Sequence, residues 1–206
     1  GAVANQTFQT TEYSVDARLR SASGAKNSIA HAALQFLPEA PGGGIFLDAG
    51  TTTAAFAELI TMQPAAKQWS IVTNSLSIAL TLANSGLDEI QLLGGSVRGI
   101  TQAVVGNAAL RTLALMRAEV AFIGTNALTV DHGLSTADSQ EAAIKSAMIT
   151  NARKVVVLCD STKMGTDYLV SFGSVDDIDV IITDANAPES FVKALRDRNV
   201  EVIIAS

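Results

Sequence analysis

The feature that most constrains the fold is a short segment, Ile45 to Thr53, in which an apolar stretch runs directly into a polar turn. Helical periodicity follows from Ala54 to Ile60. That order predicts a buried strand, a tight turn and a helix N-terminus. Free backbone N–H groups and hydroxyls at the positive end of a helix dipole are suited to binding an anion such as phosphate. Helix capping by Asp48 and the threonines explains the same residues equally well, because no phosphate-binding signature of fixed spacing is present.

The alternation of strand and helix continues along the chain. Residues 154–159 form a β-branched run, which is typical of a parallel strand covered on both faces. The pattern predicts an α/β layered fold with a mostly parallel sheet flanked by helices. The predicted strands are 45–47, 69–72, 90–93, 120–123, 154–159, 180–184 and 200–205, and the helices between them are 52–62, 76–83, 107–116, 139–151 and 188–198, with a loop or hairpin at 96–106.

The first part of the chain is less regular. Residues 1–14 are polar and lack periodicity, so we expect a linker or an extended arm there. Helical spacing runs from residue 15 to 37, with Ser23 or Asn27 as candidate starting points, and Pro38 ends it. Since no composition break follows, residues 15–206 are predicted to form one domain.

Composition excludes several functional classes. The chain has 206 residues, of which 48% are hydrophobic, and its net charge of −6 provides no basic surface for nucleic acid. No apolar run approaches the ~20 residues of a membrane span. The one cysteine, Cys159, excludes a disulfide framework and favours a reducing cytoplasm. The two histidines, His31 and His132, are expected on a helix surface and in a turn, so we predict no catalytic residues, no metal site and no cofactor.

Polar or glycine-containing turns follow several of the predicted strands. The carboxyl ends of parallel strands meet at one edge of a sheet, where ligands bind. These turns therefore predict one shared ligand site. They are Asp48–Thr51, Thr73–Ser75, Gly94–Gly95, Gly124–Asn126 and Asp160–Lys163.

Four charged side chains are candidates to complete that site. Glu141 and Lys145 lie four residues apart on one predicted helix, where a surface ion pair is the alternative. A carboxylate could accept hydrogen bonds from sugar hydroxyls, and an ammonium could neutralise a phosphate. Lys163 follows a buried strand at a position where packing needs no charge, and Lys26 is a further candidate cation.

From about residue 15 to 206, a series of short motifs resembles the effector domain of DeoR-type bacterial transcriptional repressors. Within that family the chain is most similar to the sugar-uptake repressors of actinobacteria. Glu119 departs from the aspartate common in the family, at a position before a strand where we expect little functional consequence. The motifs are Asp48–Thr52, Val72–Ser75, Leu93–Gly95, Val105–Gly106, Ala121–Gly124, Gly133–Thr136, Glu141–Lys145, Asp160–Lys163 and Ile182–Asp184.

The resemblance implies a fold similar to ribose-5-phosphate isomerase, glucosamine-6-phosphate deaminase and the CoA transferases. It also implies a cytoplasmic sensor that binds a phosphorylated sugar of the fructose phosphate class. That binding would modulate operator DNA binding by a winged helix-turn-helix domain, which is absent here and which residues 1–14 would link. No membrane contact is implied, and a homo-oligomer, dimer or tetramer, is expected.

By motif, the resemblance implies a phosphate cradle, sugar-lining residues and a set of cations. The cradle is Gly50, Thr51 and Thr52, with Thr53; the sugar-lining residues are Asp48, Asn74, Gly95, Thr125, Asn126 and Glu141; the cations are Lys163 with Lys145 or Lys26. The alternative is a sugar-phosphate isomerase or deaminase with Glu141 or Asp160 as general base. A structural oligomerisation module is a third hypothesis.

Overall fold

A computed structural model describes residues 7–206, and its centre is a seven-stranded sheet with the order β14-β13-β10-β7-β2-β3-β4. Every neighbouring pair in this sheet is parallel. The predicted mostly parallel sheet is therefore confirmed. Its strands are β2 (Gly44–Leu47), β3 (Ser70–Thr73), β4 (Ile90–Leu92), β7 (Ala118–Gly124), β10 (Ala152–Leu158), β13 (Val180–Asp184) and β14 (Glu201–Ala205).

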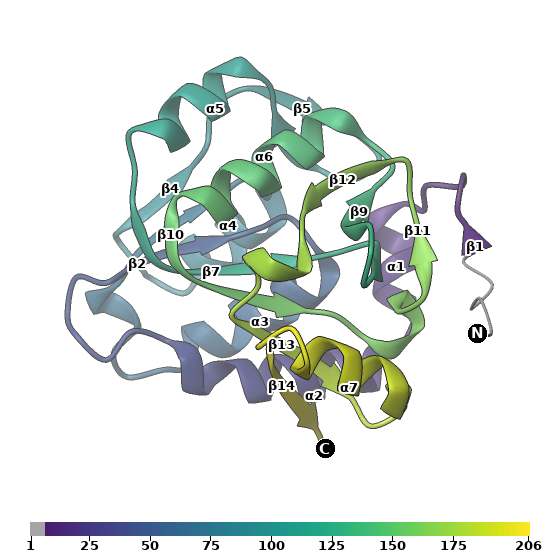
Figure 1. The fold of residues 1–206 in the computed structure, drawn as a ribbon. Coiled ribbons are helices and arrows are strands. Elements are labelled where there is room, and N and C mark those ends of the chain that lie inside the picture. Colours follow the sequence, from purple (N-terminus) through teal and green to yellow (C-terminus); the bar gives the residue numbers. More distant parts are fainter. Residues whose placement is uncertain (1–6) are drawn as a thin grey trace.

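Helices cover both faces of the sheet, as Figure 1 shows for α5 and α6 on one side and α2 and α3 on the other. Alternate strand residues point to opposite faces, so Ile45 and Leu47 enter one hydrophobic cluster and Phe46 enters the other. Both clusters are buried, which explains why the strands read as continuous apolar runs. The helices are α1 (Val15–Arg20), α2 (Ser23–Ala33), α3 (Thr51–Thr61), α4 (Leu76–Asn84), α5 (Asn107–Ala114), α6 (Ser139–Thr150) and α7 (Glu189–Arg196).

Three smaller sheets flank the main one. The predicted loop or hairpin at 96–106 is an antiparallel hairpin of β5 (Ser96–Arg98) and β6 (Ala103–Val105). A three-stranded antiparallel sheet, which the periodicity did not predict, joins β8 (Ala127–Thr129), β9 (Gly133–Thr136) and β12 (Val170–Gly173). Gly133 is required there, because its φ is +77° and a Cβ would lie 2.2 Å from the carbonyl oxygen of Gly173.

Two helices lie where the spacing predicted one between residues 15 and 37, and the second begins at Ser23, one of the two predicted starting points. The chain breaks at Ala22, which has the left-handed φ of 49°, and α2 begins at Ser23 without a side-chain cap. The ammonium of Lys26 donates hydrogen bonds to the carbonyl oxygens of Arg18 and Ser21, which satisfies acceptors at the end of α1. The break is thus stabilised by a side chain of α2 that binds the end of α1, rather than by a helix cap.

The described part of the predicted linker or arm, residues 7–14, is extended and lies against the domain. There β1 (Thr7–Phe8) pairs in parallel with β11 (Thr166–Asp167), and the N–H of Gln9 donates to the Asp167 carbonyl at 2.7 Å. Residues 1–6 lie outside the described part of the chain. None of the described helices combines the length and hydropathy needed to cross a bilayer.

Candidate functional site

A cavity of about 400 Å3 opens at the carboxyl ends of β2, β7 and β10. Residues 49–52 follow β2, residues 124–126 lie at and after the end of β7, and Asp160 and Lys163 follow β10. The strand order reverses between β2 and β7, since β3 and β4 lie to one side of them and β10, β13 and β14 to the other. Ligands bind at such a reversal in open α/β sheets, so the predicted edge of the sheet does carry a cavity.

The N-terminus of α3 forms one wall of the cavity. Gly50 caps it with extended backbone and no side chain, and the first intrahelical hydrogen bond runs from the Ala54 N–H to the Gly50 carbonyl at 2.9 Å. The N–H groups and hydroxyls of Thr51 and Thr52 have no hydrogen-bond partner within residues 7–206. These donors are available to an anion at the positive end of the helix.

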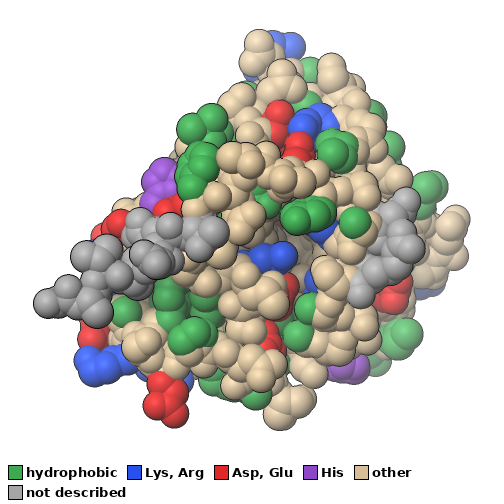
Figure 2. Space-filling view, turned by 90° about the vertical axis from the view of Figure 1, so that its right-hand side faces the viewer, with side chains coloured by type: hydrophobic (Ala, Val, Ile, Leu, Met, Phe, Trp, Pro, Cys, Tyr) green, Lys and Arg blue, Asp and Glu red, His purple; other side chains and the backbone are tan. Residues whose placement is uncertain are grey.

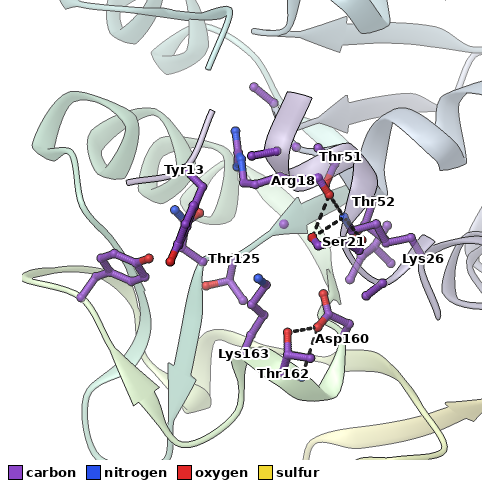
Figure 3. Close-up of a pocket in the computed structure, with 18 of the residues that line it drawn as sticks. Tyr13, Arg18, Ser21, Lys26, Thr51, Thr52, Thr125, Asp160, Thr162 and Lys163 are labelled. Atoms are coloured by element: carbon purple, nitrogen blue, oxygen red, sulfur yellow. Dashed lines mark hydrogen bonds between the residues drawn. The ribbon is translucent and has the colours of Figure 1, made fainter. Parts of the chain in front are cut away.

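Four cationic side chains also line the cavity. Arg18, Lys26, Lys145 and Lys163 contribute to its wall, whereas Asp160 is the one acid among the described residues that line it. Figure 2 shows Lys and Arg side chains at the bottom of a hollow on this face. In Figure 3, Lys163 and Asp160 point into the cavity from the segment after β10. The excess of positive charge favours an anionic ligand.

A buried ion pair positions Lys145. Its ammonium donates to Oδ2 of Asp48 and to the carbonyl oxygen of Gly124, the latter at 2.9 Å, and lies 5.3 Å from the centre of the Phe172 ring. Asp48 is 0% exposed and also accepts from the N–H of Gly124 at 3.1 Å. Burial raises the pKa of Asp48, and the attraction of Lys145 opposes that increase. Asp48 therefore lies behind the cavity and orients a cation within it.

Lys26 is held in a similar way by backbone carbonyls. Its ammonium donates to the carbonyl of Ser21 at 2.7 Å as well as to that of Arg18. Burial lowers the pKa of Lys26, with Asp160 acting in the opposite direction. An anion in the cavity would favour the charged form of this side chain.

The turn that carries Asp160 and Lys163 is fixed from the next strand. Asp184, at the end of β13, accepts from the N–H and hydroxyl of Ser161 at 2.7 and 2.9 Å and from the N–H of Asn186 at 3.0 Å. Burial alone would raise the pKa of Asp184, but these donors outweigh it and lower the pKa. The carboxylate thus fixes the backbone from which Lys163 projects.

The structure brings most of the predicted site residues to the cavity. Their roles in binding stay predictions, because the cavity geometry alone does not show a ligand contact. The predicted residues that line it are Lys26, Gly50, Thr51, Thr52, Thr125, Asn126, Lys145 and Lys163.

Five predicted residues do not line the cavity, and Asp48 is the first of them. The hydroxyl of Thr53 turns back to the carbonyls of Asp48 and Gly50 at 2.7 and 2.9 Å. The amide of Asn74 accepts from the Ala49 N–H at 2.9 Å and donates to the Val104 carbonyl at 3.3 Å. These side chains hold the strand-end loops in place.

Gly95 and Glu141 do not line the cavity either, and both contact the region of hairpin β5–β6. A Cβ on Gly95 would lie 2.4 Å from the carbonyl oxygen of Val105, so this glycine permits close packing of the hairpin. Glu141 is buried beneath that hairpin, where it accepts hydrogen bonds from Arg98 at 2.5 Å and from the hydroxyl of Thr101. The predicted sugar contacts of both residues are therefore corrected to structural contacts.

Several lining residues have no counterpart in the sequence-based prediction. Tyr13, Arg18 and Ser21 come from the segment preceding α2, and Tyr168 follows β10. Tyr13 and Tyr168 are the only two tyrosines of the chain, and amphipathic rings suit a ligand with both apolar and polar surface. That scarcity is the signal that could have identified them.

Catalytic groups are sparse at this cavity. Asp160 faces it, with its Oδ1 accepting from the Thr162 N–H at 3.1 Å and from the Thr162 hydroxyl. Burial raises the pKa of the Cys159 thiol, which disfavours a nucleophilic thiolate. The ring of His132 bonds the Tyr168 carbonyl at 3.2 Å outside the lining. Within residues 7–206 no group of three or more His, Cys, Asp or Glu side chains could hold a metal.

Comparisons with known proteins agree in pointing to one family. The family described as the DeoR C terminal sensor domain matches residues 21–185. The HTH-type transcriptional regulator GlpR of Haloferax volcanii is 36% identical over 180 residues, which cover 86% of this chain and 68% of that protein. The glycerol-3-phosphate regulon repressor of Escherichia coli strain K12 is 30% identical over 177 residues, with the same coverage of 86% and 68%.

Solved structures share the fold at low sequence identity. The probable sor operon regulator from Shigella flexneri is 13% identical with a TM-score of 0.53, over 94% of this chain and 88% of that one. Ribose 5-phosphate isomerase A from Methanocaldococcus jannaschii is 18% identical with a TM-score of 0.51, over 70% of this chain. The match spans only 55% of that isomerase, and it confirms the predicted fold alone.

Proposed function

The chain belongs to the DeoR C-terminal sensor domain family, and from that premise we propose that it senses a phosphorylated sugar and transmits the binding to a DNA-binding domain outside these 206 residues. The names of its relatives, a helix-turn-helix regulator and a glycerol-3-phosphate regulon repressor, support a role in transcription. The net charge of −6 fits DNA contact by another domain, for which residues 1–14 would be the linker. The proposal includes a cytoplasmic homo-oligomer.

One observation carries the proposal: free donors at the N-terminus of α3 meet Lys145 and Lys163 in a single cavity. A phosphate would receive backbone and hydroxyl hydrogen bonds from Thr51 and Thr52 and be neutralised by the two ammonium groups. The volume of about 400 Å3 lies within the range of roughly 300–1,000 Å3 of small-molecule sites.

The remaining lining suits the sugar rather than the phosphate. Thr125 and Asn126 follow β7 and offer neutral polar groups, and Tyr13 and Tyr168 add ring surface with a hydroxyl at the tip. We propose a phosphorylated sugar of the fructose phosphate class as the effector. The narrower resemblance to actinobacterial sugar-uptake repressors stays a prediction.

Thermal denaturation with a panel of ligands tests this function. Fructose 1-phosphate, fructose 6-phosphate, fructose 1,6-bisphosphate and glycerol 3-phosphate would be compared with unphosphorylated fructose and inorganic phosphate. A ligand at 100 times its Kd stabilises the native state by about 2.7 kcal/mol, which raises the Tm of a domain of this size by roughly 5–10 °C. If no phosphorylated compound raises the Tm at millimolar concentration, sugar-phosphate sensing is refuted.

An isomerase or deaminase on the same fold is the second candidate, because Asp160 faces the cavity as a possible general base. Incubation of each sugar phosphate with the chain, followed by detection of the isomerised or deaminated product, separates the two functions. We expect stabilisation without turnover. Product formation that disappears in Asp160→Asn would overturn the sensor and establish an enzyme.

A further inference from the structure

Residues 7–22, here called the strap, form one side of the cavity. Tyr13, Ala17, Arg18 and Ser21 of the strap all line it. In Figure 3, Tyr13, Arg18 and Ser21 lie on one side of the cavity, and Lys163 and Asp160 face them from the other. A ligand between these two sides would contact the strap directly.

The strap is attached to the domain at both ends. At its beginning, β1 pairs with β11, and the hydroxyl of Tyr168 donates to the carbonyl oxygen of Thr11 at 2.9 Å. At its end, Lys26 binds the carbonyls of Arg18 and Ser21. The position of the strap over the cavity therefore depends on what holds the residues between these attachments.

An ion pair with hairpin β5–β6 holds that middle part. Arg98 of the hairpin forms a bidentate ion pair with Glu12, with N–O distances of 2.8 and 2.9 Å. The N–H of Val15 donates to the carbonyl oxygen of Ile100 in the same hairpin at 3.1 Å. These contacts flank Tyr13 on both sides, so they set where its ring lies over the cavity.

Arg98 also connects the strap to the helix that supplies Lys145. Its guanidinium contacts Glu141 at 2.5 Å and Asp138 at 3.4 Å, both at the N-terminus of α6. Lys145 is one helical turn beyond Glu141. One guanidinium thus fixes the strap relative to the helix from which a cavity cation projects.

We propose that Glu12 and Arg98 are positioning residues that hold the strap over the cavity, so that affinity for a sugar phosphate depends on a pair outside the cavity lining. This inference rests on the proposed function. The two side chains are 18% and 19% exposed, so the pair is accessible enough to open. Because coupling between two binding equilibria is reciprocal, a ligand that binds better under the docked strap also holds the strap down.

The test uses the 206-residue chain and the variant Glu12→Gln, with fructose 1-phosphate and fructose 6-phosphate as probes. We expect Kd by calorimetry to weaken roughly fivefold or more, the lower end of typical coupling. We also expect faster hydrogen exchange at the amides of Gln9 and Val15 without ligand. Glu39→Gln removes the same charge from an exposed position and should change neither quantity.

A second variant, Arg98→Lys, keeps the positive charge beside Glu141 but loses the bidentate contact with Glu12. Like Glu12→Gln, it should weaken ligand binding. Glu12→Asp should restore part of the affinity. Unchanged exchange in Glu12→Gln would show that the pair does not hold the strap, and faster exchange with unchanged Kd would show a purely structural role. Either result overturns the inference.

Failure of the proposed function gives a different result. If the wild-type chain binds neither fructose phosphate, both the proposed sensing of fructose phosphates and the proposed role of Glu12 and Arg98 in binding them are refuted. Exchange measured without ligand would still show whether the pair anchors the strap.

Discussion

Replacing Asp48 by asparagine tests whether its buried ion pair with Lys145 stabilises the fold at the base of the cavity. The two side chains are 1% and 3% exposed, so water scarcely solvates either charge. In Asp48→Asn, the ammonium would keep the Gly124 carbonyl and the Phe172 ring but lose its counter-charge. Breaking a buried pair on one side costs about 3–5 kcal/mol, or roughly 10 °C in Tm for a domain of this size.

A double-mutant cycle with Lys145→Met separates the pair from its surroundings. Each single variant leaves one uncompensated buried group, whereas the double variant leaves no charge. We therefore expect Asp48→Asn/Lys145→Met, measured by urea denaturation, to be no less stable than either single variant. A loss below about 1 kcal/mol for Asp48→Asn, or losses that simply add, would refute the pairing argument.

Three further predictions concern the loops of the site. Lys163→Ala should weaken binding of the fructose phosphates roughly tenfold or more while leaving Tm without ligand unchanged, because the ammonium faces the cavity; a lower Tm would point to a structural role. Gly95→Ala should cost about 1–3 kcal/mol in unfolding free energy, because its Cβ would lie 2.4 Å from a carbonyl oxygen, whereas Gly94→Ala, with nothing within 4 Å, should be nearly neutral; equal losses would contradict this. Asp184→Asn should cost roughly 2 kcal/mol at pH 7. The folded-state pKa of Asp184 is lowered, so its contribution to stability is present above the ordinary value of about 3.9 and is lost as pH falls through the folded-state pKa. The difference in unfolding free energy between Asp184→Asn and the wild-type chain should therefore be smaller at pH 3 than at pH 7, and an equal difference at both pH values would contradict this.

The sheet and the edge that carries the cavity could be predicted because strands that are buried on both faces are continuous apolar runs in the sequence. A strand such as Ile45–Leu47 has no polar face, and the residues that follow it are those of a turn. Parallel pairing then places all such turns at one edge. Lys145 and Lys163 were found in this way, because both belong to elements that end or begin at that edge.

The directions of individual side chains could not be predicted in the same way. Glu141 and Lys145 share one helix face, but Glu141 faces hairpin β5–β6 and Lys145 faces the cavity. Spacing shows which residues share a face and does not show which neighbour that face meets. The short helix α1 was not predicted, whereas Ser23, one of the two predicted starting points, is where α2 begins. The left-handed Ala22 between the two helices leaves no signal in the sequence, because alanine has no preference for that region.

The reversal of strand order between β2 and β7 has a consequence for the nascent chain. The contact between Asp48 and Lys145 joins residues 97 positions apart in the sequence, next to the place where β2 and β7 pair. Until β7 has left the ribosome, β2 exposes an apolar edge with unpaired backbone groups, which is prone to aggregation. A ligand that contacts the loops after β2, β7 and β10 at once would join the early and late halves of the sheet, so binding would also depend on the correct pairing of these three strands.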